Sequence, residues 1–204
     1  MSLLHRMAKG NSDIILRDRM QFTLDAAGDR TTVYGRIDLS DYVNAVEKKG
    51  LSVKEILFQP RDPNSASLTN TGAFNFLANV NNASGTAASQ AAMKIYATTR
   101  AYENASDVGI ASPDVCAVEE WGQIIPPVQA ANDENYSFWH NRYGPLDLHP
   151  AGFTIVSDLL VGVAFDNYDA QDDDTLEVDV MIVAEPVTVT AKQITNMLTQ
   201  AQDL

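Results

Sequence analysis

Five aspartates gather in one short segment of the chain. Residues 166–174 read DNYDAQDDD. Carboxylate oxygens in a loop are the ligands that Ca²⁺ prefers, and adjacent carboxylates repel each other unless a cation or water separates them. The segment lacks the glycine that an EF-hand loop carries at its sixth position. We therefore favour a solvated acidic loop, with weak Ca²⁺ binding as the alternative, through Asp166, Asp169, Asp172, Asp173 and Asp174.

Histidines and a single cysteine are the other side chains with metal or nucleophile chemistry. His140 and His149 are separated by eight residues, and the His-x-His plus Glu arrangement of a cupin metal site does not occur. We interpret both as structural. Cys116, the only cysteine, lies in an apolar stretch, so a buried free thiol is favoured over a nucleophile, and a disulfide framework within the chain is excluded.

Paired carboxylates and nucleotide-binding loops are the remaining routes to catalysis. Glu119 and Glu120 are adjacent, and neighbours on a strand point to opposite faces, so these two do not flank one glycosidic bond. The sequence contains neither a nucleophile elbow nor a phosphate-binding or dinucleotide loop. We therefore predict no catalytic residue, no cofactor other than the weak Ca²⁺ candidate, and no small-molecule substrate.

Aromatic residues offer a binding function without catalysis. The stretch 136–143 reads YSFWHNRY, and Trp121 precedes it. Aromatic rings on one face of a strand make a platform on which sugars stack, whereas rings on alternating faces divide between core and surface. A carbohydrate-binding β-sandwich that uses Trp121, Tyr136, Trp139 and Tyr143 is the alternative function.

The elements that must position these residues are mostly strands. Two apolar, β-branched runs, at 153–165 and 176–189, flank the acidic segment and predict two long strands that form a closing hairpin. Shorter runs at 21–25, 31–39, 51–59, 73–80, 92–99 and 136–143 predict further strands, with Pro60 ending the third and an irregular stretch at 121–135. The predicted core residues of the hairpin are Val161, Val163, Phe165, Val178, Val180 and Ile182.

The sequence predicts that the 204 residues divide into three parts. Residues 1–19 are predicted to form an N-terminal arm, 20–190 an antiparallel all-β sandwich, and 191–204 an amphipathic C-terminal helix. Residues Thr190 and Gln193 match a capping box at the start of that helix. No apolar run approaches the length that spans a bilayer, and the first residues do not match a secretory signal.

Charge separates the arm from the body. The chain has a formal net charge of −13 at pH 7, which disfavours a body surface that binds nucleic acid or anionic membranes. The first twenty residues are instead mildly basic, which fits an arm that faces different surroundings. Its basic residues are Arg6, Lys9, Arg17 and Arg19.

The order of these elements resembles the single jelly-roll capsid proteins of icosahedral viruses. The resemblance rests on the short basic arm, the early pair QFTLDAAGDRTTVYGRIDLSDYV and LSVKEILFQPRDP, the polar loops, and the final DLLVGVAFDNYDAQDDDTLEVDVMIVAEP. It is one of layout and involves no invariant motif. It implies a jelly-roll β-sandwich and a major capsid protein that assembles into the shell of a virion.

The partners that the resemblance implies are copies of the chain itself and other capsid proteins. An arm of this kind faces the genome, but four basic residues are far fewer than in the tails that condense RNA or DNA. An internal membrane is therefore a second candidate for what the arm meets. The mechanism would be assembly, with apolar loop surface and edge strands buried against neighbouring subunits.

Overall fold

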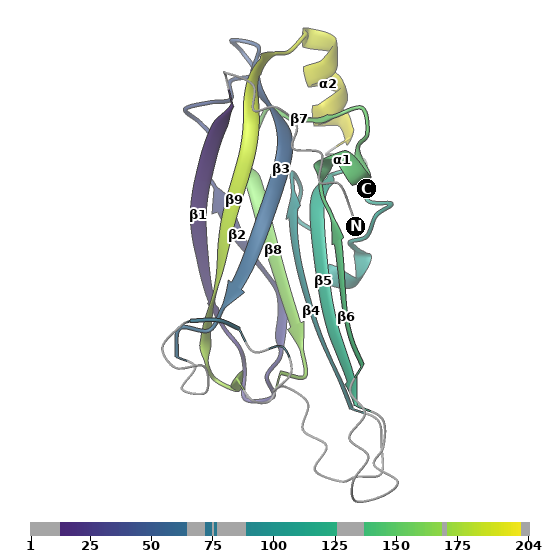
Figure 1. Cartoon of the computed structure of the whole chain (residues 1–204). Helices are drawn as coiled ribbons and strands as arrows, with labels where there is room; N and C mark the ends of the chain where they lie inside the picture. Colours follow the sequence, from purple (N-terminus) through teal and green to yellow (C-terminus); the bar gives the residue numbers. More distant parts are fainter. Residues whose placement is uncertain are drawn as a thin grey trace, which may run out of the picture.

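Two antiparallel sheets face each other in a computed structural model of the chain, which describes residues 13–64, 72–74, 76, 89–125, 137–168 and 171–200 (Figure 1). The first sheet has the strand order β1-β9-β3-β7 and the second has the order β2-β8-β4-β5-β6. The predicted all-β sandwich is therefore confirmed. The strands are β1 (Ile14–Thr23), β2 (Arg30–Ile37), β3 (Lys49–Arg61), β4 (Ser89–Thr98), β5 (Val115–Ile125), β6 (Ser137–Tyr143), β7 (Phe153–Ile155), β8 (Leu159–Asp166) and β9 (Thr175–Thr188).

Strand pairing follows a nested pattern along the chain. Strand β4 pairs with β5, β3 with β7, β2 with β8, and β1 with β9, all antiparallel. The chain thus runs like one long hairpin with its tip between β4 and β5. Strands β8 and β9 also pair with β4 and β3, respectively, and this second set of pairs completes the two sheets.

The predicted closing hairpin is wrong. The run 153–165 divides at 156–158 into the short β7 and the longer β8, which lie in different sheets. Strand β9 lies opposite β8 across the sandwich and does not pair with it. Two apolar runs around a polar loop predict two strands equally well whether these pair or face each other, so pattern alone does not decide between the two arrangements.

The core lies between the two sheets. All six residues predicted as core in the two runs are at most 5% exposed: Val161, Val163, Phe165, Val178, Val180 and Ile182. Aromatic rings continue the contact at one end, where Phe22 of β1 packs against Phe165 of β8 with ring centroids 5.3 Å apart. This alternation of buried and exposed residues is what two facing sheets require.

The predicted end of the N-terminal arm at residue 19 is wrong, and residues 1–12 lie outside the described part of the chain. Strand β1 begins at Ile14, so residues 14–19 belong to the first sheet and not to an arm. Arg17 and Arg19, which contributed to the basic charge assigned to the arm, are exposed on this strand. Asp13, which precedes β1, forms an ion pair with the Lys54 ammonium at 2.5 Å. Lys54 also forms an ion pair with Glu185 at 2.8 Å.

Two predicted strand ends are also wrong. Strand β3 continues through Pro60, which lies opposite Val178 of β9. Strand β7 pairs only with Leu51–Val53 of β3, so the other edge of β3 has no described strand beside Pro60, and the missing N–H is tolerated there. In addition, Trp121–Ile125 extends β5 where an irregular stretch was predicted.

A third layer covers the outer face of the second sheet. The segment between β4 and β5 contains a short 3₁₀ helix, η1 (Ala105–Asp107), and packs Val108 against Tyr96, Val115 and Val118. The Lys94 ammonium donates to the carbonyls of Ala105 and Val108. This layer hides part of a sheet face that would otherwise be solvent-exposed.

The described helices are short. Helix α1 (Pro145–Leu148) precedes β7, and helix α2 (Ala191–Gln200) follows β9 and lies at the end of the sandwich near β7 (Figure 1). The Gln193 Oε1 accepts a hydrogen bond from the Thr190 N–H, and the Gln193 N–H donates to Thr190 Oγ1, which is the predicted capping box. Neither helix is long and apolar enough to cross a membrane.

Replacement of Gly162 by alanine should destabilise the sandwich. Gly162 lies opposite Tyr96, and a Cβ added there would be 2.3 Å from Cζ of the buried Tyr96 ring. We expect Gly162→Ala to lower the free energy of unfolding by about 2 kcal/mol, measured by denaturant titration. Gly109→Ala is the control, because no atom lies within 4 Å of the added Cβ. Equal stability of the two variants would contradict the close packing at Tyr96.

Candidate functional site

Two buried side chains, Tyr168 and Gln171, anchor the acidic segment to the sandwich, while Asp166, Asp172 and Asp173 are exposed, as expected for solvated carboxylates. Tyr168 is 1% exposed, and its ring packs against Phe165 and Phe74 at centroid distances of 5.2 and 5.4 Å. The Tyr168 N–H donates to the Gly28 carbonyl. The segment therefore closes one end of the sandwich against the β1–β2 turn. Its acidic composition alone does not predict this packing.

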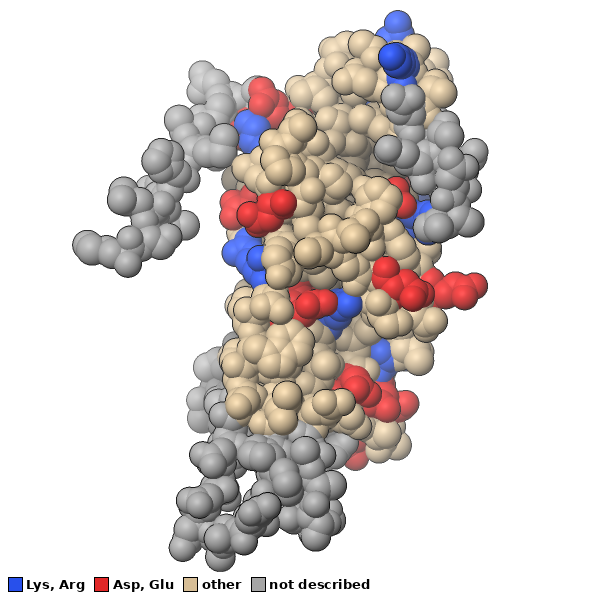
Figure 2. All heavy atoms as spheres, turned by 90° about the vertical axis from the view of Figure 1, so that its right-hand side faces the viewer, with Lys and Arg blue, Asp and Glu red and all other residues tan. Residues whose placement is uncertain are grey.

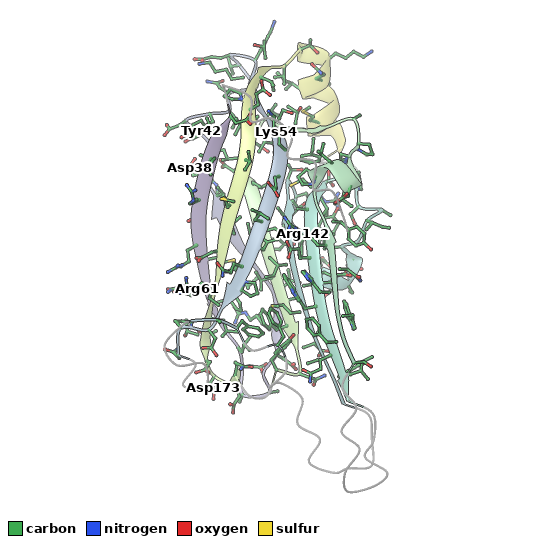
Figure 3. The ribbon with its side chains drawn as sticks, in the orientation of Figure 1. Asp38, Tyr42, Lys54, Arg61, Arg142 and Asp173 are labelled. Atoms are coloured by element: carbon green, nitrogen blue, oxygen red, sulfur yellow. The ribbon has the colours of Figure 1, made fainter. Side chains whose placement is uncertain are left out.

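The aspartates of this segment do not converge where they are described. Asp166 ends β8, and its pKa is raised by burial and by nearby Asp29. Asp172, Asp173 and Asp174 follow Gln171 in turns, with Asp173 at the end of the molecule away from α2 (Figure 3), while Asp169 lies outside the described residues. Within the described ranges, no three His, Cys, Asp or Glu side chains are grouped as a metal site requires.

Two of the four basic residues predicted for the arm, Arg17 and Arg19, lie on strand β1. Arg6 and Lys9 lie outside the described residues. Arg17 and Arg19 project from β1, where Arg19 forms ion pairs with Asp179 at 2.5 Å and Glu177 at 3.3 Å. Because its charge is compensated by these carboxylates, Arg19 does not provide the free cation that a genome-facing arm requires.

The predicted aromatic platform is divided between two faces. Trp121 is 4% exposed and points into the sandwich, whereas Trp139 is 38% exposed on the outer face of β6. A Cβ on Gly122 would lie 2.1 Å from the Trp139 ring, so this ring lies flat over Gly122. Tyr143 packs in the outer layer, and Tyr136 lies outside the described residues. Trp121 therefore does not share a sugar-stacking surface with Trp139.

A buried charged cluster joins β5 to the edge strand β6. The Glu119 carboxylate contacts Arg142 Nε at 3.0 Å and His140 Nε2 at 3.3 Å. The Glu119 side chain is only 5% exposed, while His140 and Arg142 are 39% and 41% exposed. We call these three residues the β5–β6 cluster. Glu120 points the other way and pairs with Lys94, as predicted for adjacent residues on a strand.

The same cluster also contacts the free edge of β3. The Phe58 N–H donates to Glu119, and the Arg142 guanidinium donates to the Ile56 carbonyl at 3.3 Å. Arg142 extends from β6 toward β3 (Figure 3). Beyond Val53 no described strand pairs with this edge, so two charged side chains satisfy main-chain groups that a strand would otherwise satisfy.

Aromatic rings enclose the cluster on the side away from Arg142. The Trp121 and His140 rings are stacked with centroids 4.8 Å apart, and Phe76 stacks on Trp121 at 5.7 Å. Burial raises the pKa of the Glu119 carboxyl, and this outweighs the lowering influence of Arg142 and His140. Burial therefore makes the ionised form of Glu119 more costly than it is in water, and the contacts with Arg142 and His140 offset part of that cost.

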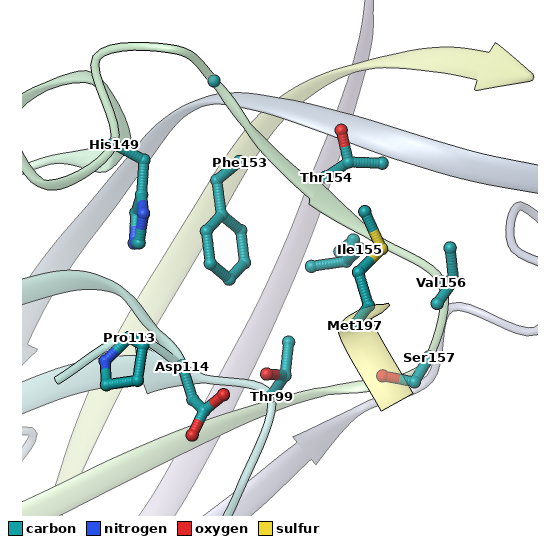
Figure 4. Close-up of a pocket in the computed structure, with 11 residues that line it drawn as sticks. Thr99, Pro113, Asp114, His149, Phe153, Thr154, Ile155, Val156, Ser157 and Met197 are labelled. Carbon is teal, nitrogen blue, oxygen red and sulfur yellow. The ribbon is translucent and has the colours of Figure 1, made fainter. Parts of the chain in front are cut away.

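A separate cavity of about 210 Å³ lies between β7, the turn before β5 and helix α2 (Figure 4). Its two titratable side chains are His149 and Asp114, and Asp114 Oδ2 is buried without a hydrogen-bond partner. His149 Nε2 lies 2.8 Å from the Val115 carbonyl and its ring packs against Phe153, while buried Asp114 lies 3.8 Å from Arg100 Nε. Met197 of α2 lines the other side, so we interpret the cavity as a gap under the docked helix.

Cys116 is buried in the core and free, as predicted. Burial raises the pKa of its thiol to about 12. At neutral pH the thiolate, which is the reactive form, is therefore almost absent.

Comparison with known proteins adds no relative. No family model matches the chain, and no curated protein matches it.

Loss of Arg142 should cost more stability than loss of an exposed ion pair. Arg142→Met leaves the buried Glu119 carboxylate without its nearest cation, and we expect the free energy of unfolding at neutral pH to fall by about 2 kcal/mol. The control is Lys49→Met, which breaks the exposed Lys49–Glu47 pair and should change stability by less than about 0.5 kcal/mol. Denaturant titrations that give equal losses would show that Arg142 does not support Glu119.

Proposed function

We propose that this chain is a structural protein of the single jelly-roll class that assembles with copies of itself into a closed shell, as the capsid proteins of icosahedral viruses do. The observation that carries the proposal is the strand order. If β6 is counted as an addition to the edge, the remaining eight strands pair first with eighth, second with seventh, third with sixth, and fourth with fifth. A hairpin rolled up in this way gives the two four-stranded sheets of a jelly roll, a fold common in viral capsids.

Exposed apolar side chains favour an assembled state over a monomer. Val46, in the turn before β3, is 92% exposed, and Ile110, in the segment before β5, is 65% exposed. Most of the described surface on the β6 side is uncharged, with acidic and basic side chains in small groups (Figure 2). Loop tips and a face of this kind are suitable for burial against neighbouring subunits.

Strand β6 offers a second kind of contact. It is an edge strand, it pairs with β5 alone among the described strands, and six of its seven residues are exposed. Phe138 and Trp139 of this strand are 46% and 38% exposed. Monomeric proteins usually protect such an edge strand from pairing with another chain, because its main-chain N–H and C=O groups are unpaired.

The proposed location is the virion, and the proposed partners are copies of the chain and other capsid proteins. The acidic body keeps finished particles apart by repulsion. Residues before β1, which carry Arg6 and Lys9, are proposed to face the genome or an internal membrane. Arg17 and Arg19 belong to the first sheet and are not proposed to make this contact.

The purified full-length chain is expected to form large oligomers or particles. Electron microscopy and light scattering after size exclusion should show them under at least one condition of salt and Ca²⁺. A chain that stays strictly monomeric across all these conditions would overturn the proposal. Binding of a monomer to a glycan array would instead support the carbohydrate-binding alternative.

The apolar loop tips give a sharper version of the test. Val46→Ser and Ile110→Ser remove exposed apolar groups, so each should leave the unfolding transition unchanged and reduce the assembled fraction in light scattering. Glu103→Gln, at an exposed position of the segment that carries Ile110, is the control and should assemble normally. Unchanged assembly in both serine variants would show that these loop tips lie outside the subunit contacts.

A further inference from the structure

Strand β6 is held to the body by two kinds of contact. On one edge it forms a ladder with β5 over Ser137–Tyr143. On its inner face, His140 and Arg142 reach the Glu119 carboxylate, and Arg142 continues to the Ile56 carbonyl of β3. The ladder does not depend on pH in the neutral range, because main-chain amides do not titrate there, so any pH dependence must come from the side chains.

Glu119 changes its surroundings when β6 moves. Its carboxylate is 5% exposed, and on the solvent side it is covered by the two side chains of β6. Release of β6 would therefore hydrate the carboxylate. Hydration on release lowers the pKa of Glu119, whereas the loss of Arg142 and His140 raises it. Burial has the larger influence of the two, so the attached state binds a proton more tightly than the released state.

We propose that the attachment of strand β6 depends on pH through the β5–β6 cluster, firmest in mild acid and weaker as the cluster loses its proton.

The direction follows from linkage between proton binding and attachment. A carboxyl whose pKa is higher in the attached state contributes its full stabilisation at a pH below the pKa of the released state. This contribution is lost as the pH rises through the higher pKa of the attached state. Burial raises the pKa of Glu119 above its ordinary value, so the loss falls on the neutral side of the usual carboxyl range.

The charged groups around Glu119 are few. Arg142 and His140 face it from β6, and Glu55 of β3 lies 3.7 Å from Arg142 on the far side. Its register partner on β4, Ile95, is apolar. Lys94 and Glu120 pair on the opposite face of the sheet and do not take part.

The inference does not rest on the proposed function, since it concerns one chain. Its consequence is that the edge presented by β6 becomes more mobile as the pH rises. A neighbour that pairs with this edge would then meet a strand whose order is set by proton binding at Glu119.

Hydrogen exchange of the full-length protein tests the inference. The opening constant of the β6 amides is obtained from exchange rates corrected for intrinsic chemistry, with the β4 amides as an internal reference. Between about pH 5 and about pH 7 it should rise at least threefold, and a single linked proton limits the rise to about tenfold per pH unit. Glu119→Gln is expected to abolish the slope, because its amide does not titrate.

The matched control is Glu120→Gln, which removes the neighbouring carboxylate from the opposite face and should keep the wild-type slope. The measured quantity is the slope, so a uniform loss of protection in Glu119→Gln does not affect the comparison. A wild-type opening constant that is independent of pH, or a slope that persists in Glu119→Gln, would overturn the inference. Loss of the slope in Glu120→Gln would do the same.

Discussion

The fold depends on the burial of β8 and β9 against each other from opposite sheets. Each strand lies inside its sheet, with β8 between β2 and β4 and β9 between β1 and β3. Their facing apolar residues, such as Val163 and Val178, exclude water from the middle of the sandwich. Because consecutive strands lie in different sheets, the connection between them must cross the end of the sandwich, and Tyr168 fills that crossing.

The unequal width of the two sheets explains the β5–β6 cluster. Strand β7 covers only three residues of β3, whereas β6 extends the opposite sheet by a full strand. The edge of β3 near Ile56 and Phe58 would otherwise leave main-chain groups unsatisfied, and Glu119 with Arg142 satisfies two of them. A carboxylate is costly inside a protein, but here it replaces hydrogen bonds that a missing strand would make.

The sequence predicted the strands and their inward faces better than their partners. Period-two alternation identified Val178, Val180 and Ile182 as core, because burial of one face imposes that pattern whatever the topology. It did not predict that β8 and β9 face each other, since pairing is a long-range property. The β5–β6 cluster was missed because Glu119 and Arg142 are far apart in sequence, and only the registers of β5 and β6 bring them together. One local feature pointed toward the cluster. Adjacent residues on a strand point to opposite faces, so either Glu119 or Glu120 had to place its carboxylate on the inner face.

The position of Cys116 has a consequence for how copies of this chain would be joined. It is the only sulfhydryl in 204 residues, and it lies between the sheets. Covalent cross-links between subunits through sulfur would therefore require the sandwich to open first. While the sandwich stays folded, contacts between copies of this chain would therefore not include disulfides of Cys116.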